Sequence, residues 1–93
     1  MTNIIWSEYF IYRVELRGFD LTTIEEILRF SGERYYDTET SRMIAVGQHN
    51  TRLVMVAYEI DNDTTTPVTI HEINRKKIRF RLRNGRFIPY GLS

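Results

Sequence analysis

The sequence predicts an α+β fold: an N-terminal helical hairpin packed on a four-stranded antiparallel meander sheet, followed by a basic C-terminal helix or an extra strand. Two observations carry this prediction. Apolar residues recur at helical spacing as far as residue 31, and from residue 33 onward they alternate with polar residues, as in strands. Short polar turns separate the alternating stretches, and strands joined by short turns run antiparallel.

The first helix is expected over residues 7–17. Trp6, Phe10 and Val14 recur at a spacing of four, which places them on one side of a helix. Ser7 can cap the free amides at the start, and Gly18 follows the last turn, where a left-handed residue is commonly needed.

A second stripe on the same helix is polar. Tyr9, Arg13 and Arg17 follow one another at a spacing of four, so they line one face. This face is either one wall of a polar groove or simply the side that meets solvent.

The second helix is expected to begin at Asp20, whose side chain can cap the amide of Thr22 or Thr23, and to end at Gly32. The residues expected on its buried stripe are Ile24, Ile27 and Leu28, with Phe30 as a further candidate. Because the connection between the two helices is short, they are expected to form a hairpin.

Four strands are expected after the helices, over residues 34–37, 42–48, 52–59 and 66–73. Polar turns over residues 38–41, 49–51 and 61–64 separate them. The third strand is apolar on both faces, so it is expected at the centre of the sheet with both faces covered.

Residues 74–86 form a basic segment that holds seven Lys or Arg and no acidic residue. The alternation over residues 77–83 is typical of a half-buried strand. A helix is favoured instead by Asn74 as an N-cap, by Asn84-Gly85 as a stop signal, and by Ile78 and Leu82 one helical turn apart. Either geometry concentrates positive charge.

Composition and length limit the classes of protein. The 93 residues are sufficient for one domain, expected over residues 1–93, and the absence of cysteine excludes disulfides and thiolate chemistry. The apolar runs are too short to cross a bilayer, and the first residues lack the features of a signal peptide. We therefore expect a cytoplasmic protein without a membrane partner.

The charge is unevenly distributed. Residues 1–47 hold five Arg and eight acidic residues, for −3, whereas residues 48–93 hold eight Lys or Arg and four acidic residues, for +4. Such a basic end is attracted to polyanions, and to the phosphates of RNA in particular. The alternative is a solvated basic face that keeps a small domain soluble.

The sequence offers no motif for a metal or a cofactor, and we expect neither. His49 and His71 have no neighbouring ligand at metal spacing. Cleavage of RNA without metal needs a group that takes the 2′-hydroxyl proton and cations that stabilise the charge on phosphorus. His71 has a suitable pKa for proton transfer, and Arg75 and Arg79 could bind a phosphate. The alternative for His71 is an ordinary, half-exposed strand residue.

Three stretches of the chain resemble a known family. They are Tyr9-x-x-x-Arg13-x-x-x-Arg17-Gly18-Phe19, then Arg42-x-x-Ala45-Val46-Gly47 with Arg52-Leu53-Val54-Met55-Val56, and finally Thr69-Ile70-His71 with Arg75-Lys76-Lys77-Ile78 and Gly85-Arg86-Phe87. Together they span roughly residues 9–87. In this order they resemble BrnT-like toxins, and uncharacterised small bacterial relatives, within the RelE/ParE toxin superfamily.

The resemblance implies an α+β toxin that cuts RNA without metal and is neutralised by an antitoxin protein, with ribosome-associated RNA as one candidate target. In the uncharacterised relatives, the position of Tyr9 is often His. The catalytic candidates are His71, Tyr9 and Arg75. The candidates for nucleic-acid binding are Arg13, Arg17, Arg52, Lys76, Lys77, Arg79 and Arg83.

Three functional alternatives stay open at this point. The first is a toxin-like RNA-binding protein, with or without metal-independent endoribonuclease activity. The second is a non-catalytic interaction module whose basic surface binds nucleic acid or an acidic protein. The third is a structural domain that pairs with another chain through an apolar stretch such as residues 87–90.

Overall fold

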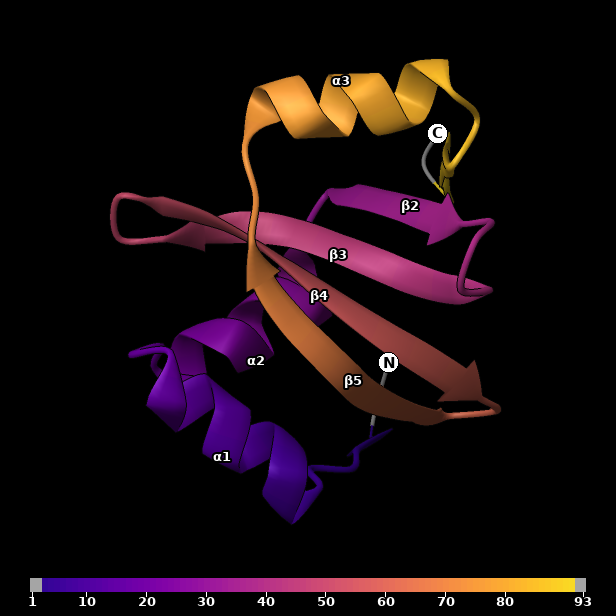
Figure 1. Ribbon diagram of the computed structural model, residues 1–93. Helices are drawn as coiled ribbons and strands as arrows, with labels where there is room; N and C mark the ends of the chain where they lie inside the picture. The colour runs from indigo at the N-terminus through magenta and orange to yellow at the C-terminus, as the bar shows by residue number, and fades with distance from the viewer. Residues whose placement is uncertain (1–2, 92–93) are drawn as a thin grey trace.

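The structure is a computed structural model that describes residues 3–91, and its centre is one mixed sheet of six strands in the order β1-β5-β4-β3-β2-β6 (Figure 1). The helices lie on both sides of this sheet, with α1 and α2 on one face and α3 on the other. The elements are β1 (Asn3–Ile4), α1 (Glu8–Leu16), α2 (Leu21–Phe30), β2 (Glu33–Asp37), β3 (Arg42–His49), β4 (Arg52–Asp61), β5 (Thr64–Glu72), α3 (Arg75–Arg83) and β6 (Phe87–Pro89).

The predicted α+β class is confirmed, as is the antiparallel meander from β2 to β5. The predicted number of strands was wrong, because the sheet has six strands rather than four. β1 pairs in parallel with β5, and β6 pairs antiparallel with β2. Both strands are very short and pair with segments far away in the sequence, so no local pattern reveals them.

All three helices begin at the predicted capping residue. Ser7 Oγ accepts a hydrogen bond from the amide of Phe10 at 3.0 Å, and Asp20 Oδ2 accepts one from the amide of Thr23 at 3.3 Å. Asn74 Oδ1 accepts from the amide of Lys77 at 2.8 Å. Each cap satisfies an amide that the first helical turn leaves free. The basic segment is therefore a helix, and the strand alternative for residues 77–83 was wrong.

The α1/α2 face carries the larger part of the hydrophobic core. The helices bury Phe10, Val14, Ile24, Ile27 and Leu28 against it. The contact is closest at Gly47, where an added Cβ would lie 2.7 Å from Ile27 Cγ1. The prediction that Phe30 joins the buried stripe was wrong. Its side chain is 77% exposed, because Phe30 is the last residue of α2 and borders an open hollow beside β3.

The α3 face has a thinner cover. Here α3 contributes the buried Ile78 and the partly buried Leu82, which pack with Tyr35, Met55 and Phe87. β4 supplies Val54, Val56 and Tyr58 to the α1/α2 face and Met55 and Ala57 to the α3 face. The prediction that this strand is central and covered on both faces is confirmed.

The apolar stretch at residues 87–90 is used within the chain. Phe87 is buried and stacks on Tyr35 with ring centroids 5.2 Å apart. Ile88 and Pro89 pair with β2. Pro89 has no N–H to offer at the outer edge of the sheet, which disfavours pairing with a further strand. Among the described residues, no helix is both long and apolar enough to cross a membrane.

Candidate nucleic-acid interface

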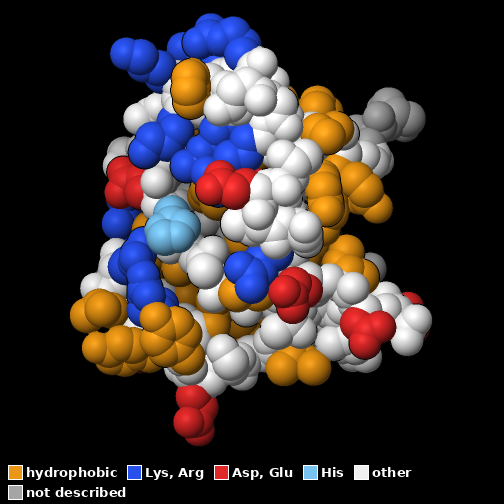
Figure 2. Space-filling view, turned by 45° about the vertical axis from the view of Figure 1, so that its right-hand side comes forward, with side chains coloured by type: hydrophobic (Ala, Val, Ile, Leu, Met, Phe, Trp, Pro, Cys, Tyr) orange, Lys and Arg blue, Asp and Glu red, His pale blue; other side chains and the backbone are white. Residues whose placement is uncertain are grey.

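A cleft of about 300 Å³ lies between α3 and the sheet. It forms because α3 buries only Ile78 and part of Leu82, so the helix covers the sheet incompletely. Its charged and ionisable lining consists of Asp37, Arg42, His71, Glu72, Lys77, Arg81 and Arg86. Figure 2 shows Lys and Arg side chains in two groups on this side of the molecule, with a histidine between the groups and acidic side chains beside them.

His71 lies on β5, opposite Met55 of β4, and lines the cleft. Its Nδ1 is 3.0 Å from Arg17 Nη1, which also donates to the carbonyl oxygen of Ile70 at 2.8 Å. Partial burial lowers the pKa of His71, and the positive charges of Arg17, Arg13, Arg81 and Lys77 lower it further. His71 is therefore mainly neutral near pH 7.

The polar stripe of α1 continues away from His71. Tyr9 accepts a hydrogen bond at its hydroxyl from Arg13 Nη1 at 2.6 Å, and the guanidinium carbon of Arg13 lies 5.6 Å from the centroid of the Tyr9 ring. Arg17 follows one turn later and contacts His71. Tyr9 is 61% exposed, and its hydroxyl is bonded to Arg13, one helical turn before the arginine that contacts His71.

Arg75 is held at the start of α3 by an acidic partner. Its Nη1 lies 2.6 Å from Glu33 Oε2, which also accepts a hydrogen bond from the Tyr35 hydroxyl at 2.6 Å. Burial would raise the pKa of Glu33, but the bonds from Arg75 and Tyr35 outweigh it and keep this pKa below its ordinary value. Burial and the Glu33 carboxylate raise the pKa of Tyr35 to about 12. Arg75 thus anchors α3 to β2.

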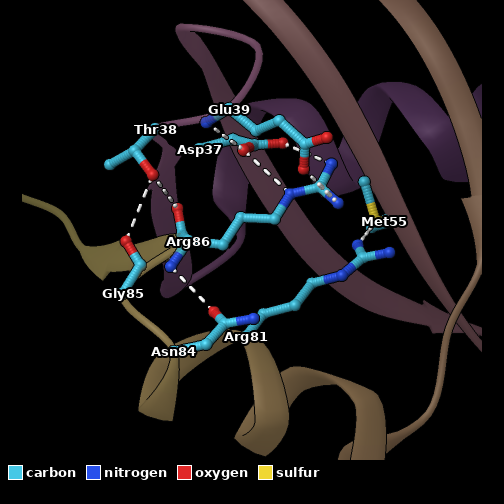
Figure 3. Close-up of polar contacts among 8 residues, drawn as sticks. All are labelled: Asp37, Thr38, Glu39, Met55, Arg81, Asn84, Gly85 and Arg86. Atoms are coloured by element: carbon cyan, nitrogen blue, oxygen red, sulfur yellow. Dashed lines mark hydrogen bonds and ion pairs between the residues drawn. The ribbon is translucent and has the colours of Figure 1, made fainter.

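Arg86 anchors the other end of the basic segment (Figure 3). Its Nε and Nη2 donate to the two carboxylate oxygens of Asp37, each at 3.0 Å, and its Nη1 lies 2.8 Å from Glu39 Oε2. Asp37 is only 1% exposed. Burial would raise its pKa, but hydrogen bonds from Arg86, the Glu39 amide and Thr40 keep the pKa of Asp37 below its ordinary value.

Arg81 reaches into the cleft without a carboxylate partner among the described residues (Figure 3). Its Nη1 lies 3.6 Å from the sulfur of Met55, and its guanidinium carbon lies 5.3 Å from the centroid of the Phe87 ring. Burial lowers the pKa of Arg81, and the neighbouring Arg86 lowers it further. The positive charge of Arg81 is therefore only partly compensated by the protein.

The remaining cations of α3 are unpaired within the described part of the chain. Across residues 3–91, no ion pair or side-chain hydrogen bond involves the side chains of Lys76, Lys77, Arg79 or Arg83. Lys77 lines the cleft, whereas Lys76 and Arg83 border a shallow hollow around Phe80, a side chain that is 57% exposed. Within the described residues, ion pairs thus hold the basic segment near its two ends, and the cations between them have no acidic partner.

Arg52 was expected to bind phosphate, but its guanidinium is occupied by the protein. It donates to the carbonyl oxygens of Arg17 at 3.2 Å and Gly18 at 3.0 Å, and its guanidinium carbon lies 4.1 Å from the centroid of the Phe19 ring. These contacts satisfy carbonyls at the end of α1. Arg52 is not among the residues that line the cleft.

The structure brings together some of the predicted site residues but not all. Arg13, Arg17 and Lys77 surround His71, whereas Arg75 pairs with Glu33 on β2 and does not line the cleft. The three catalytic candidates therefore do not converge on one point. Arg81 lines the cleft but was not among the predicted site residues, although its position one helical turn after Lys77 was a usable signal.

His49 is part of the core. Its Nε2 accepts a hydrogen bond from the Asp20 amide at 2.8 Å, and its ring packs edge-on against Phe19. Within residues 3–91, no group of three or more His, Asp or Glu side chains is arranged to hold a metal ion.

Comparisons with protein-family models, curated proteins and solved structures found no match to this chain. The resemblance to BrnT-like toxins of the RelE/ParE superfamily therefore stays a prediction.

Proposed function

We propose that the protein binds RNA along α3 and in the adjoining cleft. The observation that carries this proposal is the row of unpaired cations, because Lys76, Lys77, Arg79 and Arg83 have no acidic partner within the described residues. Within the part of the chain that the structure describes, no ion pair with an acidic side chain neutralises these four charges. A ligand with repeating negative charge binds such a row favourably and releases counterions on binding.

The cleft adds a defined position to this charged surface. Lys77 and Arg81 enter it from α3, and His71 enters it from β5. The pKa of Arg81 is lowered by burial and by Arg86, so a bound anion would relieve an unfavourable interaction. A volume of about 300 Å³ is at the lower end for a ligand site and suits one phosphate with part of its nucleotide.

The geometry favours binding over cleavage. Cleavage without metal requires a group that accepts the 2′-hydroxyl proton, and the Nδ1 atom of His71 already accepts a hydrogen bond from Arg17. Ribonuclease activity, an antitoxin partner and a cytoplasmic location stay predictions from the sequence. An acidic protein partner is the alternative, and it would use the same unpaired cations.

The test is a titration of fluorescein-labelled single-stranded RNA by fluorescence anisotropy, between about 50 and 200 mM salt. The double substitution Lys76→Gln/Arg83→Gln removes two unpaired cations. It should weaken binding and reduce the slope of log affinity against log salt by about 1.4, since each contact to a single strand contributes about 0.7. The matched control is Arg29→Gln on α2, where the arginine pairs with Glu25, and it should leave the slope unchanged.

An affinity that does not depend on salt would contradict the proposal. An equal loss of affinity per removed charge in the double variant and in the Arg29→Gln control would also contradict it, because it would show that net charge alone matters. Binding of a poly-glutamate peptide more tightly than RNA would favour the acidic protein partner instead.

A further inference from the structure

We propose that Arg17 is a positioning residue that fixes His71 as a neutral imidazole with its proton on Nε2. In this state His71 offers a hydrogen-bond donor to a ligand in the cleft. The inference rests on the proposed RNA binding for its functional meaning. The state of the imidazole itself can be measured without RNA.

The backbone of Arg17 is held on both sides. Its amide donates to the carbonyl of Arg13 at 3.1 Å, and its carbonyl accepts from Arg52 at 3.2 Å. The side chain then extends from the C-terminal end of α1 to β5. It reaches this strand at Ile70 and His71, further along than Thr64 and Thr65, which pair with β1. There Nη1 donates to the Ile70 carbonyl at 2.8 Å, which fixes the guanidinium beside His71.

The contact between Arg17 and His71 determines the tautomer. A guanidinium has five N–H donors and no acceptor, and it stays protonated in proteins. In the bond of 3.0 Å between Arg17 Nη1 and His71 Nδ1, the imidazole nitrogen must therefore be the acceptor. A neutral imidazole carries one proton, so this proton lies on Nε2. The Nη1 atom carries two hydrogens, so it can donate one to His71 Nδ1 and the other to the Ile70 carbonyl oxygen.

The surrounding charges favour the same neutral state. Arg13 and Arg17 act on His71 from α1, and Lys77 and Arg81 act on it from α3. Glu72, the next residue on β5, also lines the cleft. A second proton on His71 would have to sit on Nδ1, where it would break the hydrogen bond from Arg17 and face four cations. Partial burial is the largest cause of the lowered pKa of His71, and these four positive charges lower it further.

The consequence for the site is a defined role for His71. An Nε2–H group can donate to a phosphate oxygen or to a carbonyl oxygen of a base. It cannot accept the proton of a 2′-hydroxyl, and the nitrogen that could accept it is bonded to Arg17. His71 is thus a contact for the ligand, and Arg17 acts through it.

The tautomer can be read directly from long-range ¹H–¹⁵N correlation spectra of the free protein, recorded between about pH 5.5 and 8. Wild type should show His71 with Nδ1 unprotonated and Nε2 protonated, and His71 should titrate below 6.5. The variant His71→Gln assigns the signals against those of His49. A wild-type spectrum with the proton on Nδ1 would overturn the proposal without any variant.

Three substitutions separate the hydrogen bond from the charge. Arg17→Ala should give a mixture of tautomers and raise the pKa of His71. Arg13→Ala removes a charge that acts on His71 but no bond to its ring, so it should raise the pKa and leave the tautomer unchanged. Arg79→Ala is the matched control and should change neither. An unchanged tautomer in a folded Arg17→Ala protein would contradict the role of Arg17.

Addition of the labelled RNA distinguishes this inference from the proposed function. A shift of the His71 Nε2–H signal on binding supports both. RNA binding with the proton on Nδ1 would overturn the positioning role alone. The expected tautomer without RNA binding would support the positioning role and overturn the proposed ligand.

Discussion

The two faces of the sheet are covered in different ways. On one face, α1 and α2 bury five large hydrophobic side chains against the strands. On the other face, α3 buries Ile78 and part of Leu82, and ion pairs from Arg75 and Arg86 hold the two ends of the basic segment. The first face is fixed by apolar packing, whereas the second combines a smaller apolar contact from its helix with ion pairs.

The difference follows from the composition of the helices. α3 has six cations in nine residues, so it can turn only a narrow apolar stripe toward the sheet. Removing its cations from water would be costly unless each gained a partner. The helix therefore packs incompletely, and the cleft lies in the uncovered space. The six cations of α3 therefore explain both the attraction to a polyanion and the incomplete packing of the helix.

The largest expected effect is on the α1/α2 face. Leu28 is fully buried, and Leu28→Ala should lower the free energy of unfolding by about 3–5 kcal/mol through lost burial and a cavity. Leu82→Ala on α3 should cost about half as much, because Leu82 is only partly buried. Urea denaturation of both variants measures the difference. Equal losses of unfolding free energy in the two variants would show that the packing on both faces contributes equally to stability.

The next effect concerns the anchor of α3. Arg86→Ala leaves the Asp37 carboxylate buried without its two guanidinium donors, and should cost about 3 kcal/mol. Arg42→Ala removes an arginine whose partner, Glu59, is largely exposed, and should cost less than about 1 kcal/mol. The comparison uses the same denaturation experiment. If Arg86→Ala lowers the free energy of unfolding by less than Arg42→Ala does, Arg86 is not an anchor.

A smaller effect is expected from overpacking beneath α2. Gly47→Ala places a Cβ 2.7 Å from Ile27 Cγ1, and should cost about 1–3 kcal/mol as the helix shifts. Gly32→Ala is the matched control, because an added Cβ there has no atom within 4 Å. Thermal unfolding should show a lower midpoint for Gly47→Ala alone. Similar midpoints would indicate that α2 is less closely packed than the contact suggests.

The smallest effect should appear in acid. Asp37 and Glu33 have pKa values below their ordinary values of 3.8 and 4.5, so the unfolded chain binds more protons than the folded one. Their contribution to stability is complete above the ordinary values and is lost as the pH falls through the folded ones. Because both residues anchor α3, its amide signals should change before those of α1 and α2 between about pH 5 and 3. If the amide signals of all three helices change at the same pH, the two faces of the sheet do not differ in their sensitivity to acid.

The parts of the fold predicted correctly are those determined by local sequence. Ser7, Asp20 and Asn74 each cap a helix through an amide three residues away, so the signal lies within one turn. The meander follows from alternation and short turns in the same way. β1 and β6 were missed because they pair with Thr64–Thr65 and with β2, and such pairing depends on the assembled sheet.

The candidate site was predicted in part for a similar reason. The count of cations could be read directly, but their partners could not. Arg75 pairs with Glu33 at a separation of 42 residues, and Arg86 pairs with Asp37 at a separation of 49. Which cations are neutralised depends on these distant contacts. The contact between Arg17 and His71, 54 residues apart, is equally invisible in the sequence.

The route of the chain through α3 has one more consequence. The strand pairings make β5 and β6 run in the same direction, so α3 is the crossover between two strands that lie on either side of β4, β3 and β2. If the helix unwinds, its flanking segments keep their places in the hydrogen-bonded sheet. It can then refold without a long search, since the loop that must close is short. Local melting of this crossover is therefore a readily reversible event, separate from denaturation of the whole molecule.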